Sequence, residues 1–268
     1  MNTTLNNGIE MPMLGLGVYD MHNDEAINAV EHALKTGYRL IDTASMYGNE
    51  EQVGIAVRNS RIPRQDIFVT TKVNNTDQGY DSTLRAFEKS MKKLDIGHID
   101  LYLVHWPIRH KRKETWKALE HLYDQKMVRA IGVANYLLPF LDELESYANI
   151  VPAVDQVEFS PWLHLDALLA HTKNKGIVLQ SYTPLARGKK FDDPRIQQLC
   201  AKYNKTPSQV ILRWNLQLGV STIPKSSNPK RIEENFHVFD FEISGEDMKL
   251  LNNMNENFRV VDDPMEIF

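Results

Sequence analysis

The sequence has 268 residues, 42% hydrophobic and 25% charged, which is enough for one large buried core. Its formal net charge of −4 gives no sign of a surface built for nucleic acid or anionic membranes. Cys200 is the single cysteine, so an intrachain disulfide and a cysteine-based metal cluster are excluded.

The first ten residues, MNTTLNNGIE, are polar and lack the basic and apolar regions of a signal peptide. No apolar stretch approaches the roughly 18 residues that span a bilayer. We therefore expect a cytoplasmic protein with neither a membrane nor a nucleic-acid partner.

Short apolar runs recur along the chain and predict eight β-strands. The runs are continuous and rich in β-branched residues, as is typical of parallel strands buried on both faces. They cover Met13–Gly17, Tyr38–Asp42, Ile67–Lys72, Ile99–His105, Arg129–Ala134, Ala153–Phe159, Ile177–Tyr182 and Val220–Pro224.

Between the runs, apolar residues recur at helical spacing. The clearest faces run from Ala26 to Leu34 before Gly37, from Leu84 to Leu94 before Gly97, from Trp116 to Tyr123, and from about Leu165 to Gly176. Glycine just past a last helical turn is a common stop, because it adopts a left-handed conformation at little cost. Eight βα units without a linker favour a closed (β/α)8 barrel, with a doubly wound open sheet as the alternative.

The first strand contains GLGVYD, which resembles the start of a dinucleotide-binding fingerprint. Gly15 and Gly17 fit, but Asp20 stands where the third glycine should be. No acidic partner follows at the expected distance, so we reject a Rossmann-type site.

Polar side chains gather where the predicted strands end. In a barrel these ends form one face, which carries the catalytic groups. Each residue alone has an ordinary structural explanation, but a polar group at six successive strand ends predicts a polar site, because unpaired buried charge is costly. The residues are Asp42, Lys72, His105, Asn135, Gln156 and Tyr182, with Tyr47 just beyond the second strand.

The residue types favour proton transfer to a carbonyl oxygen. The sequence has neither HExxH-type metal spacing nor a GxSxG nucleophile elbow, so we expect no metal site. A lysine beside Tyr47 is expected to lower the pKa of the phenol, and Asp42 to orient that lysine. His105 can donate a hydrogen bond to a carbonyl oxygen, and Tyr47 can protonate it. Such a site reduces carbonyls if something supplies hydride.

The sequence resembles the aldo-keto reductases along nearly its whole length, most closely the shorter microbial branch with diketogluconate and methylglyoxal reductases and prostaglandin F synthases. The matching motifs are DTASMYGNE (Asp42–Glu50), IDLYLVHWP (Ile99–Pro107), IGVANY (Ile131–Tyr136), DQVEFSP (Asp155–Pro161), QSYTPL (Gln180–Leu185) and IPKSSNPKRIEENF (Ile223–Phe236). The fold implied is a single (β/α)8 TIM barrel domain over residues 1–268, with a short N-terminal hairpin and a C-terminal tail over the barrel mouth.

The resemblance also implies a catalytic tetrad and NADPH bound across the mouth. The tetrad is Asp42, Tyr47, Lys72 and His105. At the nicotinamide end it implies Gly17, Val18, Asn135, Gln156, Tyr182 and Leu185, with Tyr182 stacked on the ring. Around the 2′-phosphate and adenine it implies Lys225, Ser226, Arg231, Glu234 and Asn235. Cations at a helix start suit a phosphate; the ordinary alternative is a solvated, capped surface helix.

Two residues depart from the family pattern. Ala134 replaces the usual serine before Asn135, which removes a contact to the carboxamide worth roughly 0.5–1.5 kcal/mol. Asp155 replaces the usual asparagine before Gln156, and an acid there faces either the site or the scaffold.

Three features offer substrate contacts. Tyr19, Trp106 and Trp162 are candidates for an aromatic pocket, with core packing as the alternative. The basic run Arg109–Lys113 is either solvated loop charge or an attractor for anionic substrates. The segment Asn255–Phe268 is expected to fold over the mouth and bring Phe258 or Phe268 near the substrate; a frayed end is the alternative.

The leading hypothesis is a monomeric, NADPH-dependent reductase of small-molecule aldehydes or ketones. A regulatory or redox-sensing NADP(H)-binding barrel with little turnover is a second hypothesis, since fold does not determine function. A metal-dependent barrel enzyme is a third, and it predicts activity lost with chelator.

Overall fold

The computed structural model describes residues 1–267, so the expectation for Phe268 lies outside the described residues. Eight parallel strands form one sheet in the order β10-β9-β8-β7-β6-β5-β4-β3. The strands are β3 (Leu16–Gly17), β4 (Leu40–Asp42), β5 (Phe68–Val73), β6 (Ile99–Val104), β7 (Val128–Ala134), β8 (Val154–Glu158), β9 (Val178–Tyr182) and β10 (Ser221–Thr222). All eight predicted strands are therefore present, six of them shorter than expected by one to three residues.

Parallel bridges close the sheet into a barrel between its first and last strands. Leu14 pairs with Thr222, and Gly17 pairs with Lys225. A Cβ on Gly17 would lie 2.9 Å from the Ile223 carbonyl oxygen, so a glycine is what lets these two strands approach. The predicted (β/α)8 barrel is confirmed, and the open-sheet alternative is wrong.

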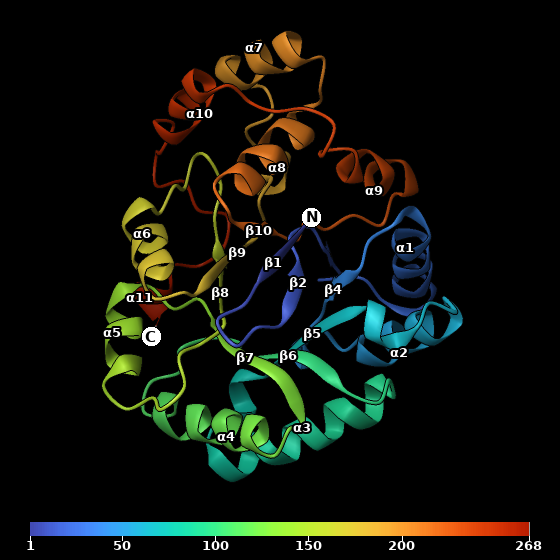
Figure 1. Ribbon diagram of the computed structural model, residues 1–268, viewed down its shortest axis with the longest axis vertical. Coiled ribbons are helices and arrows are strands. Elements are labelled where there is room, and N and C mark those ends of the chain that lie inside the picture. The colour runs from blue at the N-terminus through green and yellow to red at the C-terminus, as the bar shows by residue number, and fades with distance from the viewer. Residues whose placement is uncertain (268) are drawn as a thin grey trace.

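Helices surround the strands on the outside (Figure 1). They are α1 (Asn23–Thr36), α2 (Glu50–Asn59), α3 (Tyr80–Leu94), α4 (Arg112–Asp124), α5 (Leu138–Glu145), α6 (Asp166–Asn174), α7 (Pro194–Tyr203), α8 (Pro207–Gln217), α9 (Pro229–Phe236), α10 (Gly245–Asn252) and α11 (Pro264–Ile267). Short 3-10 turns are η1 (Ser45–Tyr47), η2 (Arg64–Asp66), η3 (Asn75–Asp77) and η4 (Ala186–Gly188). No helix within residues 1–267 has the length and apolarity needed to cross a membrane.

Two apolar layers hold the barrel together. In β6, Tyr102 and Val104 belong to the layer between strands and helices, while Leu101 and Leu103 fill the barrel interior. This alternation follows from the two-residue period of a strand. The direction of every barrel side chain can therefore be assigned from its neighbours.

An N-terminal hairpin closes the amino end of the barrel. Strands β1 (Asn2–Thr4) and β2 (Glu10–Pro12) pair antiparallel, and Leu5 and Met11 pack into the interior apolar cluster. Asn7 Nδ2 donates to the Arg129 carbonyl at the start of β7, at 2.9 Å. The hairpin lies over the strands in the centre of Figure 1. With this end plugged, the polar strand ends are left at the opposite, carboxyl end.

The C-terminal tail crosses the carboxyl end of β8. The backbone N–H groups of Val260 and Val261 donate to the Glu158 carboxylate at 2.8 and 3.2 Å. The N–H of Phe258 donates to the Trp162 carbonyl at 3.0 Å. The tail over the mouth is confirmed, and the frayed-end alternative is wrong for the described residues.

Candidate active site

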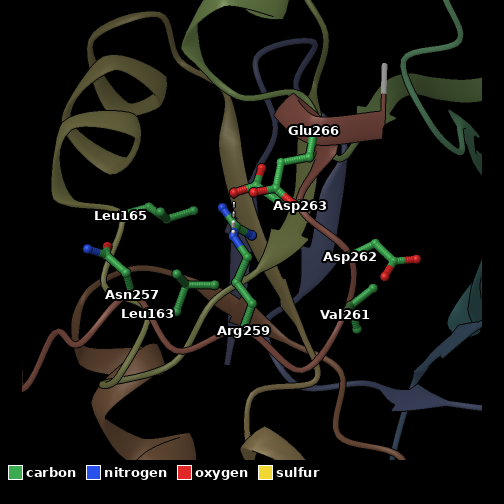
Figure 2. A pocket seen from close by; sticks show the side chains of 8 residues that line it. All are labelled: Leu163, Leu165, Asn257, Arg259, Val261, Asp262, Asp263 and Glu266. Carbon is green, nitrogen blue, oxygen red and sulfur yellow. Dashed lines mark ion pairs between the residues drawn. The ribbon is translucent and has the colours of Figure 1, made fainter.

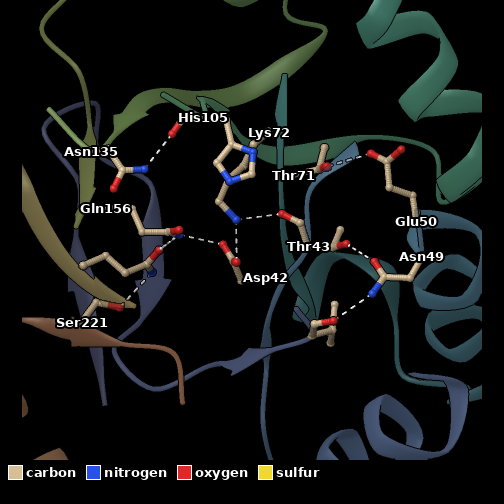
Figure 3. Close-up of polar contacts among 12 residues, drawn as sticks. Asp42, Thr43, Asn49, Glu50, Thr71, Lys72, His105, Asn135, Gln156 and Ser221 are labelled. Carbon is tan, nitrogen blue, oxygen red and sulfur yellow. Dashed lines mark hydrogen bonds and ion pairs between the residues drawn. The ribbon is translucent and has the colours of Figure 1, made fainter. Parts of the chain in front are cut away.

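The barrel brings the four predicted catalytic residues together. Asp42 ends β4, Lys72 lies near the end of β5, His105 follows β6, and Tyr47 lies in η1 between β4 and α2. Lys72 Nζ donates to Asp42 Oδ1 at 2.6 Å and to the Thr43 carbonyl at 2.9 Å. Figure 3 shows the Lys72 ammonium directed at Asp42 and at Thr43.

The Tyr47 ring packs between these groups. Lys72 Nζ is 5.2 Å from the centre of the Tyr47 ring, and the Tyr47 and His105 ring centres are 5.6 Å apart. Tyr19 lies edge-on to Tyr47 at 5.1 Å between ring centres. A phenol, an imidazole and an ammonium therefore share one small volume.

Burial governs the protonation states of the Asp42–Lys72 pair. Neither side chain is more than 3% exposed. Burial lowers the pKa of Lys72, against the opposing effect of the Asp42 charge. Burial also raises the pKa of Asp42, while the Lys72 charge and hydrogen bonds from Lys72 and Gln156 lower it. The 2.6 Å contact opposes both shifts, because each charge stabilises the other.

Tyr47 and His105 are both neutral at ordinary pH. Burial first, and then the Asp42 charge, raise the pKa of Tyr47 well above its ordinary value. The expectation of a lowered pKa for this phenol is therefore wrong, because burial and the neighbouring Asp42 charge raise it. Burial, with Lys72 adding to it, holds the pKa of His105 well below its ordinary range. The pocket presents a phenol that keeps its proton beside an uncharged imidazole.

A chain of buried amides forms the floor of the site. Gln156 Nε2 donates to Asp42 Oδ2 and to Gln180 Oε1, both at 2.7 Å, and Gln180 Nε2 donates to Ser221 Oγ at 3.1 Å. Both N–H groups of Gln156 are thus used inside the protein. Sequence reasoning missed Gln180 and Ser221. The signal was the position of Gln180 two residues before Tyr182, on the same predicted strand.

Asn135 joins the histidine segment to Tyr182. Its Nδ2 donates to the His105 carbonyl at 2.9 Å, and its Oδ1 accepts from the Tyr182 hydroxyl at 2.7 Å. Asn135 has φ of 65°, an unusual conformation that asparagine tolerates better than most residues. Three of the predicted strand-end residues are thus linked directly.

The two family departures fall on opposite sides of the sheet. Ala134 packs with the interior cluster, toward the site. Asp155 alternates with inward-facing Gln156 and so faces the layer between sheet and helices, where it is fully buried. Asp155 therefore belongs to the scaffold. Of the two orientations that the sequence allowed for this acid, the structure therefore shows the one away from the site.

The residues predicted for the far end of the cofactor lie in α9 and in the segment just before it. Lys225 and Arg231 are exposed, while Ser226 and Asn235 are buried. Asn235 Oδ1 is buried without a hydrogen-bond partner among the described residues. Glu234 is already engaged, because its Oε1 accepts from Thr206 Oγ1 at 2.8 Å. At the near end, Gly17 and Val18 are buried beside β4, and Leu185 is half-buried at the start of η4.

The candidate substrate residues divide into two groups. Tyr19 is 56% exposed next to Tyr47, and Trp106 is half-buried directly after His105. Trp162 is fully buried, and its Nε1 donates to Asp193 Oδ2 at 3.1 Å. The idea that Trp162 lines a substrate pocket is therefore wrong, because it packs under the tail.

The basic run does not present a continuous charged surface to the mouth. Arg112 pairs with Glu143 at 2.7 Å, donates to the Pro107 carbonyl at 2.8 Å and lies against the Phe140 ring. Lys113 lies over Tyr147. Arg112 and Lys113 therefore turn toward α5 and the residues after it, and the expectation that they attract anionic substrates loses its geometric basis.

A cavity of about 420 Å³ opens where the tail passes the β8–α6 connection (Figure 2). Arg259 pairs with Asp263 at 3.1 Å across it, and Asp262 and Glu266 also line it. None of the predicted catalytic residues lines this cavity. Among residues 1–267, no group of three His, Cys, Asp or Glu side chains is arranged to hold a metal ion.

Comparison with known proteins gives a consistent result. The family described as "Aldo/keto reductase family" matches residues 13–256. The chain is 49% identical to a glyoxal reductase of Bacillus subtilis over 98% of this chain and 96% of that one. It is 45% identical to a 9,11-endoperoxide prostaglandin H2 reductase of Trypanosoma cruzi, over 99% and 95% of the two chains.

Solved structures show the same architecture. A mutant of Gox0644 in complex with NADPH superimposes with a TM-score of 0.94 at 40% identity, covering 99% of this chain and 97% of that one. A Bombyx mori aldo-keto reductase in complex with NADP superimposes with a TM-score of 0.92 at 33% identity, covering 98% and 95%.

Proposed function

Because this chain belongs to the aldo/keto reductase family, we propose that it reduces aldehydes or ketones with NADPH and that Tyr47 donates the proton. One observation carries the proposal: the four residues Asp42, Lys72, Tyr47 and His105 meet at the carboxyl end of the barrel. Oxidoreductase activity on carbonyls follows from the family. The roles of the individual residues are our proposal.

Several features of the chain fit the cofactor. The buried, unpartnered Asn235 Oδ1 suits an amino group such as that of adenine. Exposed Lys225 and Arg231 suit the 2′-phosphate. At the other end, Gln156 would hold the carboxamide through Oε1, since both its N–H groups are used, and Tyr182 would lie against the ring. When bound, NADPH supplies the hydride that adds to the carbonyl carbon.

The protein's own residues manage the proton. Tyr47 transfers its phenolic proton to the carbonyl oxygen as negative charge develops there, leaving a phenolate that solvent reprotonates. Lys72 stabilises that phenolate, and Asp42 holds the ammonium in place. His105, being neutral, donates a hydrogen bond that orients the carbonyl oxygen. The raised pKa of Tyr47 is compatible with this role, because a donor must keep its proton until the oxygen becomes basic.

Small aldehydes are the first substrates to test. The B. subtilis relative is named for glyoxal, and the T. cruzi relative for a much larger endoperoxide. The exposed Tyr19 and half-buried Trp106 leave the mouth open beside Tyr47. We propose glyoxals and aromatic aldehydes as the leading substrate class, with keto sugars and quinones completing the panel.

The test is NADPH oxidation against that panel, with Tyr47→Phe compared with Tyr80→Phe. Tyr80 packs against His121 on the outer helices, so it serves as a matched control. Tyr47→Phe should lower kcat for aldehydes by roughly 10²–10⁴-fold, the usual contribution of a general acid, and Tyr80→Phe should leave it unchanged. If Tyr47→Phe keeps most of the activity, the proton-donor assignment fails. NADPH binding without turnover of any substrate would instead favour the regulatory hypothesis.

A further inference from the structure

Asn49 occupies the position that usually caps a helix, yet it does not cap one. It immediately precedes α2, but its side chain makes no hydrogen bond to the first turn. A residue type favoured at helix starts for capping has its polar group committed elsewhere.

The Asn49 amide instead makes three hydrogen bonds in a fully buried setting. Its Oδ1 accepts from Thr43 Oγ1 at 2.6 Å, and its Nδ2 donates to the Val18 carbonyl at 2.8 Å and the Met21 carbonyl at 2.9 Å. Asn49 and Thr43 are both 0% exposed. Figure 3 shows the Thr43 hydroxyl directed at the Asn49 amide.

These contacts close the loop that carries Tyr47. Thr43 directly follows Asp42, and the bond from Thr43 to Asn49 joins the two ends of the segment whose tip holds η1 and Tyr47. The Val18 and Met21 carbonyls belong to the neighbouring loop, which carries Tyr19 against the Tyr47 ring. One side chain therefore fixes the phenol relative to Asp42 and to the adjacent loop.

Two further bonds hold the same loop, one at the start of η1 and one at the start of α2. Ser45 Oγ donates to the Lys72 carbonyl at 3.0 Å, and Thr71 Oγ1 donates to Glu50 Oε1 at 2.7 Å. Among the described residues, no hydrogen bond to the Tyr47 hydroxyl is recorded, so loop geometry and ring packing aim it.

We propose that the Thr43–Asn49 pair is a positioning element for the proton donor, a clasp that keeps the Tyr47 hydroxyl over the reacting carbonyl. This inference rests on the proposed role of Tyr47. An ordinary structural polar cluster would affect stability alone. If the pair instead positions Tyr47, breaking the Thr43–Asn49 bond should slow only the reactions that need the phenolic proton.

Two substrate classes separate these cases. Hydride addition to an aldehyde leaves an alkoxide, a base comparable to hydroxide, so a well-placed acid matters greatly. Net transfer of a hydride to one quinone oxygen moves an electron pair to the other and gives the hydroquinone monoanion, an aryloxide whose conjugate acid has a pKa near 10 like tyrosine itself. Quinone reduction therefore depends far less on Tyr47 but equally on NADPH placement.

The experiment compares Thr43→Val, which removes only the hydroxyl donor, with Thr43→Ser, which keeps it. Thr172→Val is the matched control, since it removes another buried threonine hydroxyl, bound to the Leu169 carbonyl in α6. Thr43→Val should lower aldehyde kcat by roughly 10- to 100-fold, as small misplacements do, while quinone turnover stays within about threefold. Thr43→Ser should recover most of the loss, and Thr172→Val should lower only the unfolding midpoint. If Thr43→Val does not fold, Thr43→Ala removes the same hydroxyl and leaves room for a water.

Equal losses on aldehyde and quinone, or no loss on either, would overturn the clasp. These outcomes are distinct from failure of the proposed function, which shows as retained aldehyde reduction in Tyr47→Phe.

Discussion

Asp155 is an ionisable carboxyl group in a buried environment that does not stabilise a charge. It is 0% exposed, and neither carboxyl oxygen has a hydrogen bond of normal geometry among residues 1–267. Burial raises the pKa of Asp155 well above its ordinary value, offset only in part by the Tyr136 backbone N–H. The carboxyl is therefore protonated in the folded protein over a range where the unfolded chain ionises it.

This mismatch predicts that Asp155→Asn stabilises the protein. Below about pH 4 the carboxyl is protonated in both states. As pH rises, the unfolded state gains by ionising, so the cost of folding Asp155 grows until the raised folded pKa is passed. At pH 7 the variant should gain about 0.5–2 kcal/mol, the usual range for a single stabilising substitution. Denaturant unfolding at pH 4 and pH 7 checks this; a gain equal at both pH values would contradict it.

Residue identities were easier to predict than their partners. Asp42, Lys72 and His105 could be assigned because parallel strands of one barrel end at the same face. Gln180 and the true role of Asn49 could not, because their partners lie on segments whose register only the folded chain defines. The raised pKa of Tyr47 likewise depended on how the folded chain packs the phenol beside Asp42.

At the scale of elements, one carboxylate holds the C-terminal tail against β8. Glu158 accepts from the N–H groups of both Val260 and Val261. Outside this contact, the tail relies partly on surface pairs, such as Glu256 with Lys190 and Arg195 at 2.7 and 2.8 Å. Exposed pairs of this kind contribute little, about 0–1 kcal/mol. Glu158 is therefore the buried side-chain attachment of the tail, beside the backbone bonds from Glu256 and Phe258 to the Trp162 carbonyl.

Glu158→Gln should loosen the tail without unfolding the barrel. A glutamine offers one acceptor in place of two and turns an NH₂ toward a backbone donor. We expect local opening to become easier by about 1–2 kcal/mol, seen as roughly tenfold faster amide exchange near residues 258–262 with little change in global unfolding. Glu256→Gln is the control. Equally fast exchange in the control would place the attachment at the surface pairs instead.

The elements themselves were largely predictable from local pattern. All eight strands and their parallel pairing followed from apolar runs alternating with helical spacing. Helix ends were less certain: α3 stops at Leu94, where Asp95 takes the left-handed conformation ahead of Gly97. An aspartate in that conformation carries little sequence signal, whereas Gly37 after α1 was the expected stop.

Across the whole molecule, the two ends of the barrel carry different tasks. The carboxyl end holds the buried Asp42–Lys72 pair and the neutral Tyr47 and His105. The amino end is plugged by the hairpin and tied by Asp100 near the start of β6. Asp100 is fully buried, pairs with Arg64 and Arg129 at 2.6 and 2.7 Å, and accepts from the Val69 N–H at 2.9 Å.

This division predicts that Asp100→Asn costs stability but not activity. Burial alone would raise the pKa of Asp100, but the hydrogen bond from His98, the Arg64 charge and the Val69 N–H together hold it below its ordinary value. A depressed folded pKa means that the stabilisation is present above about pH 4 and is lost as pH falls through the folded pKa.

We expect Asp100→Asn to lower the free energy of unfolding at pH 7 by about 1.5–3 kcal/mol, as for hydrogen bonds to charged groups. The partly exposed arginines limit the loss, because water can solvate them when the carboxylate is gone. The difference from the parent protein should shrink as unfolding is measured toward pH 3, while kcat and KM at 25 °C stay unchanged because the reacting groups lie at the opposite end. A fall in kcat at temperatures where the variant is fully folded would show that the two ends are coupled.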